Sequence, residues 1–196
     1  MRHGRRFGDL ELSALAVDVR ELLERSVTSL RSHLVTRPTG RAVRIAIERQ
    51  LDMLVAPALS LVDLSSVAIL DYSCADEVVA KLLLRKRGPA GSAFFVLMGV
   101  KAHHRDPIEA VLERHALAVV AETGPGRYNM IGVGSDGERT LWSRVERSGC
   151  VRAGKVAELV AARGQRRDLD ALLTRRLVFR NPASGDLHAL STLLRT

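Results

Sequence analysis

Apolar and polar positions change their period several times along the chain, and each change predicts a different element. Residues 10–34 repeat apolar side chains at helical spacing, with arginines and glutamates on the opposite face. This pattern predicts a long N-terminal helix, and we assign residues 1–35 to it. Pro38 and Gly40 then interrupt the pattern, which leaves Thr39 as the expected N-cap of a second helix over 40–54.

Short apolar runs alternate with helical patterns in the middle of the chain. Runs at 59–64, 92–99 and 117–122 predict buried strands, and 128–133 is expected to pair with the last of them across a Gly/Pro turn. A helical stripe begins at Ala75, and a second helix is expected to start at Asp106 and Pro107. Strands that alternate with helices predict an α/β domain over 36–134, with a mixed sheet and packed helices.

Beyond residue 138 the order of the predicted elements differs. Three short helical patterns at 139–147, 154–163 and 167–176 precede a strand, a Gly/Pro turn and another strand. Three helices that end in a β-hairpin are the layout of a winged helix-turn-helix, so we expect a small α+β winged-helix domain over 138–196. On its layout this segment resembles the winged-helix domains of prokaryotic transcription regulators.

The segment "LVDLSSVAILDYSCADEVVAKLL" at 61–83 carries the most specific motif. It resembles the STAS domain of bacterial anti-sigma-factor antagonists, and more closely the STAS-like family that shares its core. The resemblance covers about residues 36–122 and implies a STAS-like fold. Asp63 matches the acid at the end of a strand, Asp71 the acid of the second motif and Ser73 the residue that antagonists phosphorylate. Tyr72 and Cys74 depart from the family pattern.

Ser73 has two compatible interpretations. With Asp76 it forms the S-x-x-D pattern of a capping box, and a capping hydroxyl stabilises a helix by about 1 kcal/mol. As a candidate phosphorylation site, it would place its phosphate at a helix N-terminus, although nearby acids oppose a dianion. Asp71, Asp76 and Glu77 also form a carboxylate cluster that suits Mg²⁺, but acids commonly fill a first helical turn. We therefore expect no bound metal.

Positive charge is concentrated in the last third of the chain. Residues 1–138 contain 18 Lys/Arg against 17 Asp/Glu, whereas residues 139–196 contain 12 against 5. Such a basic segment favours a nucleic-acid partner. The pattern "QRRDLDALLTRR" is then the expected recognition helix. The candidate DNA-binding residues are Gln165, Arg166, Arg167, Arg175, Arg180 and Asn181. Because many winged helices bind only protein, a protein partner stays open.

Nothing in the sequence favours an enzyme or a cofactor. The G-x-G-x-x-G pattern at 132–137 lacks a following βαβ unit, so we interpret these glycines as a hinge between domains. Two cysteines without close spacing and no long apolar run indicate a cytoplasmic protein with no membrane span.

Together these patterns predict a non-enzymatic prokaryotic regulatory protein in which a STAS-like domain senses a partner or phosphorylation and a winged helix binds DNA. The alternative is a partner-switching module whose winged helix binds protein. Its expected partner is a kinase-like ATPase or a sigma-like factor. The apolar face of the N-terminal helix offers a surface for a homodimer.

Overall fold

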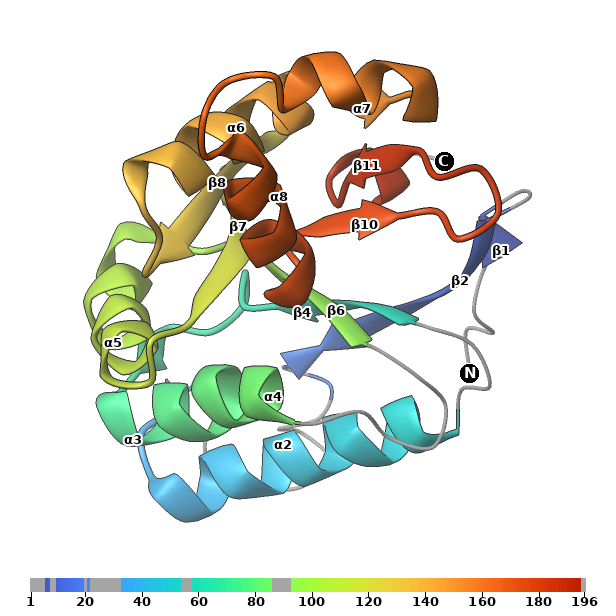
Figure 1. Ribbon diagram of the computed structural model, residues 1–196. Helices are drawn as coiled ribbons and strands as arrows, with labels where there is room; N and C mark the ends of the chain where they lie inside the picture. The colour runs from blue at the N-terminus through green and yellow to red at the C-terminus, as the bar shows by residue number, and fades with distance from the viewer. Residues whose placement is uncertain are drawn as a thin grey trace.

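The computed structural model describes residues 6–7, 10–19, 21, 33–53, 58–85 and 93–194 (Figure 1). Its main sheet has the strand order β1-β2-β4-β6-β7-β8, in which β2, β4, β6 and β7 are parallel and the two edge strands are antiparallel. These strands are β1 (Arg6–Phe7), β2 (Leu10–Asp18), β4 (Ala58–Asp63), β6 (Ala93–Met98), β7 (Ala118–Gly124) and β8 (Arg127–Gly132). The α/β class with a mixed sheet is therefore confirmed.

Helices and two very short strands connect the sheet strands. Strands β3 (His33–Leu34) and β5 (Ile69–Leu70) form a separate parallel pair. The helical segments are α2 (Arg37–Asp52), α3 (Tyr72–Ala75), the π-helical turn η1 (Asp76–Ala80), α4 (Lys81–Leu84) and α5 (Ala102–Arg114). Segments α3, η1 and α4 run on from one another, so one continuous helix with a widened central turn follows β5.

The predicted N-terminal helix is wrong over residues 10–18, which form β2. This strand lies between β1 and β4, and it pairs with β4 in parallel from Ser13↔Ala58 to Asp18↔Asp63. At its end Val17 and Val19 are buried while Ala16 and Asp18 are exposed, which is the period of a strand. The hydrogen bonds that this segment makes with β4, about 45 residues away, therefore favour a strand although its apolar residues have helical spacing. Residues 33–34 of the predicted helix form β3, and residues 22–32 lie outside the described residues. The homodimer surface expected along residues 10–34 therefore falls partly on β2, which is paired with β1 and β4, and partly outside the described residues.

Two predicted helix starts also shift. Helix α2 begins at Arg37, because the Thr36 side chain, rather than that of Thr39, is the cap and accepts from the Thr39 amide. Pro38 fits this first turn, where its missing N–H costs no helical hydrogen bond. Helix α5 begins at Ala102 instead of Asp106, since the His104 ring accepts from the Lys101 amide at 3.3 Å.

The C-terminal segment folds into helices and a small sheet, as its local patterns predict. Its elements are α6 (Asp136–Ser148), β9 (Cys150–Val151), α7 (Ala153–Leu159), α8 (Gln165–Thr174), β10 (Val178–Arg180), β11 (Leu187–Ala189) and the 3₁₀ turn η2 (Thr192–Leu194). The small sheet has the antiparallel order β10-β11-β9. The sequence did not predict β9, a two-residue strand between helices.

The main sheet has a hydrophobic core on each face. On one face, α2, the α3–η1–α4 helix and α5 pack on the side chains of Val62, Phe95, Leu97, Val119, Ala121 and Ile131. On the other face, the C-terminal segment packs on those of Leu59, Phe94, Val96, Ala118, Val120 and Met130. The molecule therefore has three layers, and residues after 135 share one core with the sheet.

Hydrogen bonds and close contacts join the C-terminal segment to the sheet. Arg176 donates to the Ala93 carbonyl at 2.9 Å, and Arg175 donates to the Val133 carbonyl. A Cβ on Gly137 would lie 2.5 Å from the Asp168 carboxylate, so the Asp168 side chain of α8 packs directly against this position of α6. Gly132 has a φ of +91° beside the Leu117 carbonyl. The glycines interpreted as a hinge thus lie in tightly packed surroundings.

Candidate nucleic-acid interface

The candidate interface is built on α8 and on the turn that joins β10 to β11. Leu169 and Leu172 of α8 are buried in the C-terminal core, which fixes the helix against α6. Its opposite side carries Arg166, Arg167 and Asp170, all exposed. One face of α8 therefore holds the helix in place, while the N-terminal part of the other presents two guanidinium groups to solvent.

Arg166 and Arg167 occupy an electrostatically unfavourable position for the helix itself. Helix α8 begins at Gln165 after Gly164, whose φ is +89°, so both arginines lie in its first turn. Cations at a helix N-terminus oppose the helix dipole and cost stability, typically 0.3–1 kcal/mol each. Among the described residues neither arginine forms an ion pair that would offset this cost. The arrangement suits an external anion.

The turn between β10 and β11 is ordered by Asn181, which is 9% exposed. Its side-chain oxygen accepts from the Ala183 amide at 2.9 Å, and its backbone carbonyl accepts from the Gly185 amide at 2.8 Å. Asn181 therefore shapes the turn instead of presenting its amide to a ligand. Arg180, just before it, is exposed.

Two more predicted DNA-binding residues make internal contacts. In the amide orientation that satisfies both of its groups, Gln165 donates to the Leu159 carbonyl at 2.8 Å and accepts from Arg144 at 3.2 Å. Arg175 bonds to the Val133 carbonyl and lies 3.9 Å from a Glu138 carboxylate oxygen. Of the six predicted residues, Arg166, Arg167 and Arg180 are exposed, and the other three support the local fold.

Sequence reasoning missed two exposed arginines in this region. Arg163 lies in the turn before α8, and a scan for cations around the predicted recognition helix could have found it. Arg152 caps α7, and its side chain is 83% exposed, with the guanidinium 3.7 Å from the Asp186 carboxylate next to the turn. No sequence signal places Arg152 there, because the contact depends on the pairing of β9 with β11.

The STAS-like motif residues lie on the other side of the main sheet. Asp63 ends β4 and accepts from the Ser65 amide at 2.8 Å. Asp71, not Ser73, is the N-cap of α3: its carboxylate accepts from the Cys74 amide at 2.7 Å and from the Ser73 hydroxyl at 2.9 Å. The capping role predicted for Ser73 is therefore wrong. Ser73 is half-buried, beside Tyr72, which is 60% exposed.

Asp76 and Glu77 do not pair with Ser73 and form a buried ion cluster instead. Asp76 contacts His115 and Arg37, and Glu77 contacts Lys81, Arg37 and Arg44. Burial opposes ionisation of both acids, but these hydrogen bonds outweigh it, so the pKa of Asp76 and that of Glu77 lie below their ordinary values. Both carboxylates are thus paired with basic side chains.

The thiol of Cys74, in the same motif, is buried and inert. Its Sγ donates to the Thr36 carbonyl at 2.9 Å. Burial, and then the Asp71 carboxylate, raise the pKa of Cys74 to about 12, so the thiol stays protonated at neutral pH. Cys74 therefore serves packing between α2 and α3.

Comparisons with known proteins add no relative to this description. No protein-family model matches the chain, and neither the curated proteins nor the solved structures contain a match. Within the described ranges, no helix is both long enough and apolar enough to cross a membrane.

Proposed function

We propose that this chain is a non-enzymatic regulatory protein that binds duplex DNA through α8 and the β10–β11 turn. The observation that carries the proposal is the pair of exposed arginines in the first turn of α8, where their charge opposes the helix dipole. A DNA phosphate would relieve this conflict, because Asp168 is the one acid in this turn and, among the described residues, it forms no ion pair with either arginine.

The order of the C-terminal elements supports a winged helix-turn-helix. The chain runs α6–β9–α7–α8–β10–β11, and the small sheet has the order β10-β11-β9. In this arrangement α8 corresponds to the recognition helix and residues 181–186 to the wing. Arg163, Arg166 and Arg167 then lie at the end of the helix that meets base edges and phosphates, and Arg180 lies at the base of the wing.

The remainder of the chain supports a sensing role for a STAS-like domain. Three helical segments cover one face of a mixed sheet, and Asp63 and Asp71 lie at the ends of successive strands before a long helix. Ser73 directly follows Tyr72, whose side chain is exposed, and Ile69 of β5 is exposed as well. Binding of a protein partner to this exposed surface would fit a regulatory function.

The test is the salt dependence of DNA binding by the full chain, measured by fluorescence anisotropy with labelled duplexes of mixed sequence. Each phosphate contact contributes a slope of about −0.9 to the plot of log affinity against log salt. We expect the Arg166→Ala/Arg167→Ala variant to lower the magnitude of the slope by about two and to weaken binding.

A matched control separates this site from a general loss of charge. Arg105→Ala/Arg114→Ala removes two exposed arginines of α5, which packs on the opposite face of the sheet. We expect this variant to bind as the unmodified chain does. Equal weakening by both double variants, or full affinity in the α8 variant, contradicts the proposal. Absence of any duplex binding would favour the alternative, a winged helix that binds protein.

A further inference from the structure

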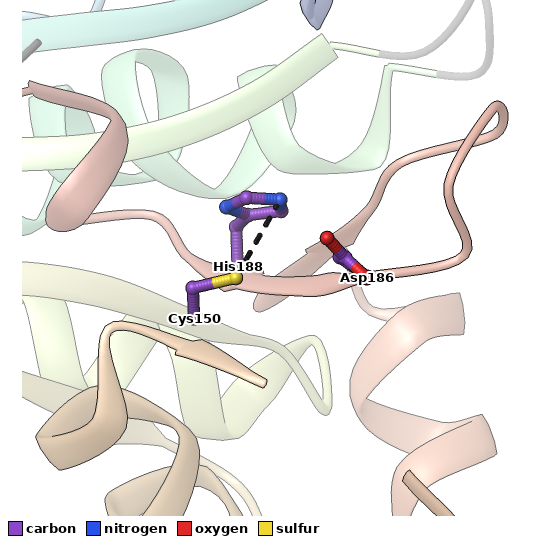
Figure 2. Close-up of side chains that lie close together, drawn as sticks. All are labelled: Cys150, Asp186 and His188. Carbon is purple, nitrogen blue, oxygen red and sulfur yellow. Dashed lines mark hydrogen bonds between the residues drawn. The ribbon is translucent and has the colours of Figure 1, made fainter. Parts of the chain in front are cut away.

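Three side chains of different metal-binding types converge at the small C-terminal sheet. Cys150 on β9, His188 on β11 and Asp186 just before β11 each offer a ligand atom, and these atoms all lie within 4.8 Å of one another (Figure 2). The pairing of the strands causes this arrangement, because Cys150 and His188 are direct partners in the β9–β11 register. Among the described residues this is the one such group.

We propose that Cys150, Asp186 and His188 bind a divalent transition-metal ion, for which Zn²⁺ is the best match. A thiolate, an imidazole and a carboxylate are all ligands that Zn²⁺ accepts, whereas Ca²⁺ and Mg²⁺ prefer oxygen alone. Three protein ligands leave the fourth tetrahedral position for water. The inference is independent of DNA binding.

The distances fit such a site. The Cys150 Sγ and the His188 Nε2 are 4.0 Å apart, too far for a strong hydrogen bond. With ordinary Zn–S and Zn–N bonds of about 2.3 and 2.1 Å, a tetrahedral centre places these two atoms roughly 3.6 Å apart. A few tenths of an ångström of side-chain adjustment therefore brings both atoms to bonding distance.

Two contacts hold the Asp186 carboxylate in place and leave some of its acceptor positions unused. One of its oxygens accepts from the Ala153 amide at 2.8 Å, and the Arg152 guanidinium approaches the other at 3.7 Å. A carboxylate has about four acceptor positions, so Asp186 can bind a metal while it keeps the amide. Such outer contacts orient metal ligands in known sites.

The proton balance of metal binding follows from the ligand types. A metal binds a neutral imidazole and a thiolate, so His188 can ligate through a ring nitrogen while the Cys150 thiol must give up its proton. One proton is accordingly released to solvent as the Zn–S bond forms, and no oxidation is involved.

The test is the binding of Zn²⁺ and Co²⁺ to the full chain after treatment with chelator. We expect one Zn²⁺ per chain by calorimetry. We also expect Co²⁺ to give a thiolate charge-transfer band that Cys150→Ser abolishes. Cys150→Ser and His188→Ala should each weaken Zn²⁺ binding at least tenfold, and Asp186→Asn should weaken it while keeping an acceptor for the Ala153 amide.

Matched controls use the same residue types elsewhere in the chain. Cys74→Ser changes the buried thiol of the other core, and His103→Ala removes an exposed histidine of α5. We expect both to keep Zn²⁺ affinity and the Co²⁺ band. Circular dichroism of each variant establishes that it is folded. A chain that binds no Zn²⁺, or one whose affinity is the same in folded Cys150→Ser and His188→Ala variants, would overturn the proposal.

Discussion

At the scale of single residues, the strand-to-helix junction at 70–75 shows how two capping patterns compete. The segment contains two residues that could cap the helix. Ser73 could cap it with Asp76 three positions later, and Asp71 could cap it by accepting from the amide of Cys74, also three positions later. The second pattern prevails because one Asp71 oxygen accepts both the Cys74 amide and the Ser73 hydroxyl. The choice between the two patterns depends on where the helix starts. The Asp71 amide donates to the Leu34 carbonyl of β3 at 2.9 Å, a contact between distant segments that local sequence does not reveal.

This arrangement predicts unequal effects of two alanine substitutions. Asp71→Ala removes the cap and should lower the free energy of unfolding by about 1 kcal/mol, the usual cost of a lost N-cap. Ser73→Ala removes only a hydroxyl donor and should cost less than half as much. Urea denaturation of both variants at neutral pH measures the difference. A larger loss from Ser73→Ala would mean that the serine carries the cap after all.

At the scale of elements, the π-helical turn η1 holds the two buried acids. Asp76 is 6% exposed and Glu77 is 2% exposed, and both lie in a widened turn that faces α2 and the end of α5. From the sequence, these acids were expected to stabilise the helix as negative charges in its first turn. Lys81 is a local partner at i,i+4 from Glu77, which helical spacing could have indicated. The other partners, Arg37, Arg44 and His115, lie more than thirty residues away, so no local pattern could reveal them.

Glu77→Gln is expected to destabilise the fold strongly at neutral pH. The change removes the carboxylate charge that Lys81, Arg37 and Arg44 share. Loss of one partner in a buried ion pair costs roughly 3–5 kcal/mol. Glu109→Gln, in the exposed ion pair with Arg105, is the matched control and should change the free energy of unfolding by less than about 1 kcal/mol.

The same cluster predicts a loss of stability in acid. The folded-state pKa values of Asp76 and Glu77 lie below the ordinary 3.8 and 4.5, so the acids stabilise the fold above those pH values. This contribution disappears as the pH falls through the folded-state pKa values. Urea denaturation at pH 7 and at about pH 3 should therefore show the gap between the unmodified chain and Glu77→Gln narrowing in acid. A gap that stays constant would contradict this account.

At the scale of the whole molecule, both faces of the main sheet are covered. The strands β4, β6 and β7 read as nearly continuous apolar runs, which is typical of strands buried on both faces. That pattern made the strands predictable, and local spacing likewise predicted α6, α7 and α8. The packing of the C-terminal segment onto the sheet was not predictable, because a continuous apolar run does not say which element will cover it.

A chain that ends at residue 134 should therefore be poorly soluble. Such a fragment would expose the apolar side chains of Leu59, Phe94, Val96 and Val120 on the bare face of the sheet. We expect it to aggregate in size-exclusion chromatography, whereas the full chain should elute as a compact species. A soluble, folded fragment would show that residues 36–134 form an independent domain.

The strands that separate the two cores also connect them. Along β6, Phe95 and Leu97 point into the core beneath α2 and α5, while Phe94 and Val96 point into the core beneath α8. Successive side chains of a strand are only about 3.3 Å apart along the chain. If a partner shifts the helices on one side, the disturbance crosses a single layer of peptide backbone before it reaches the residues that support α8. Communication between the two faces, if a partner drives it, would then need neither a hinge nor a moving linker.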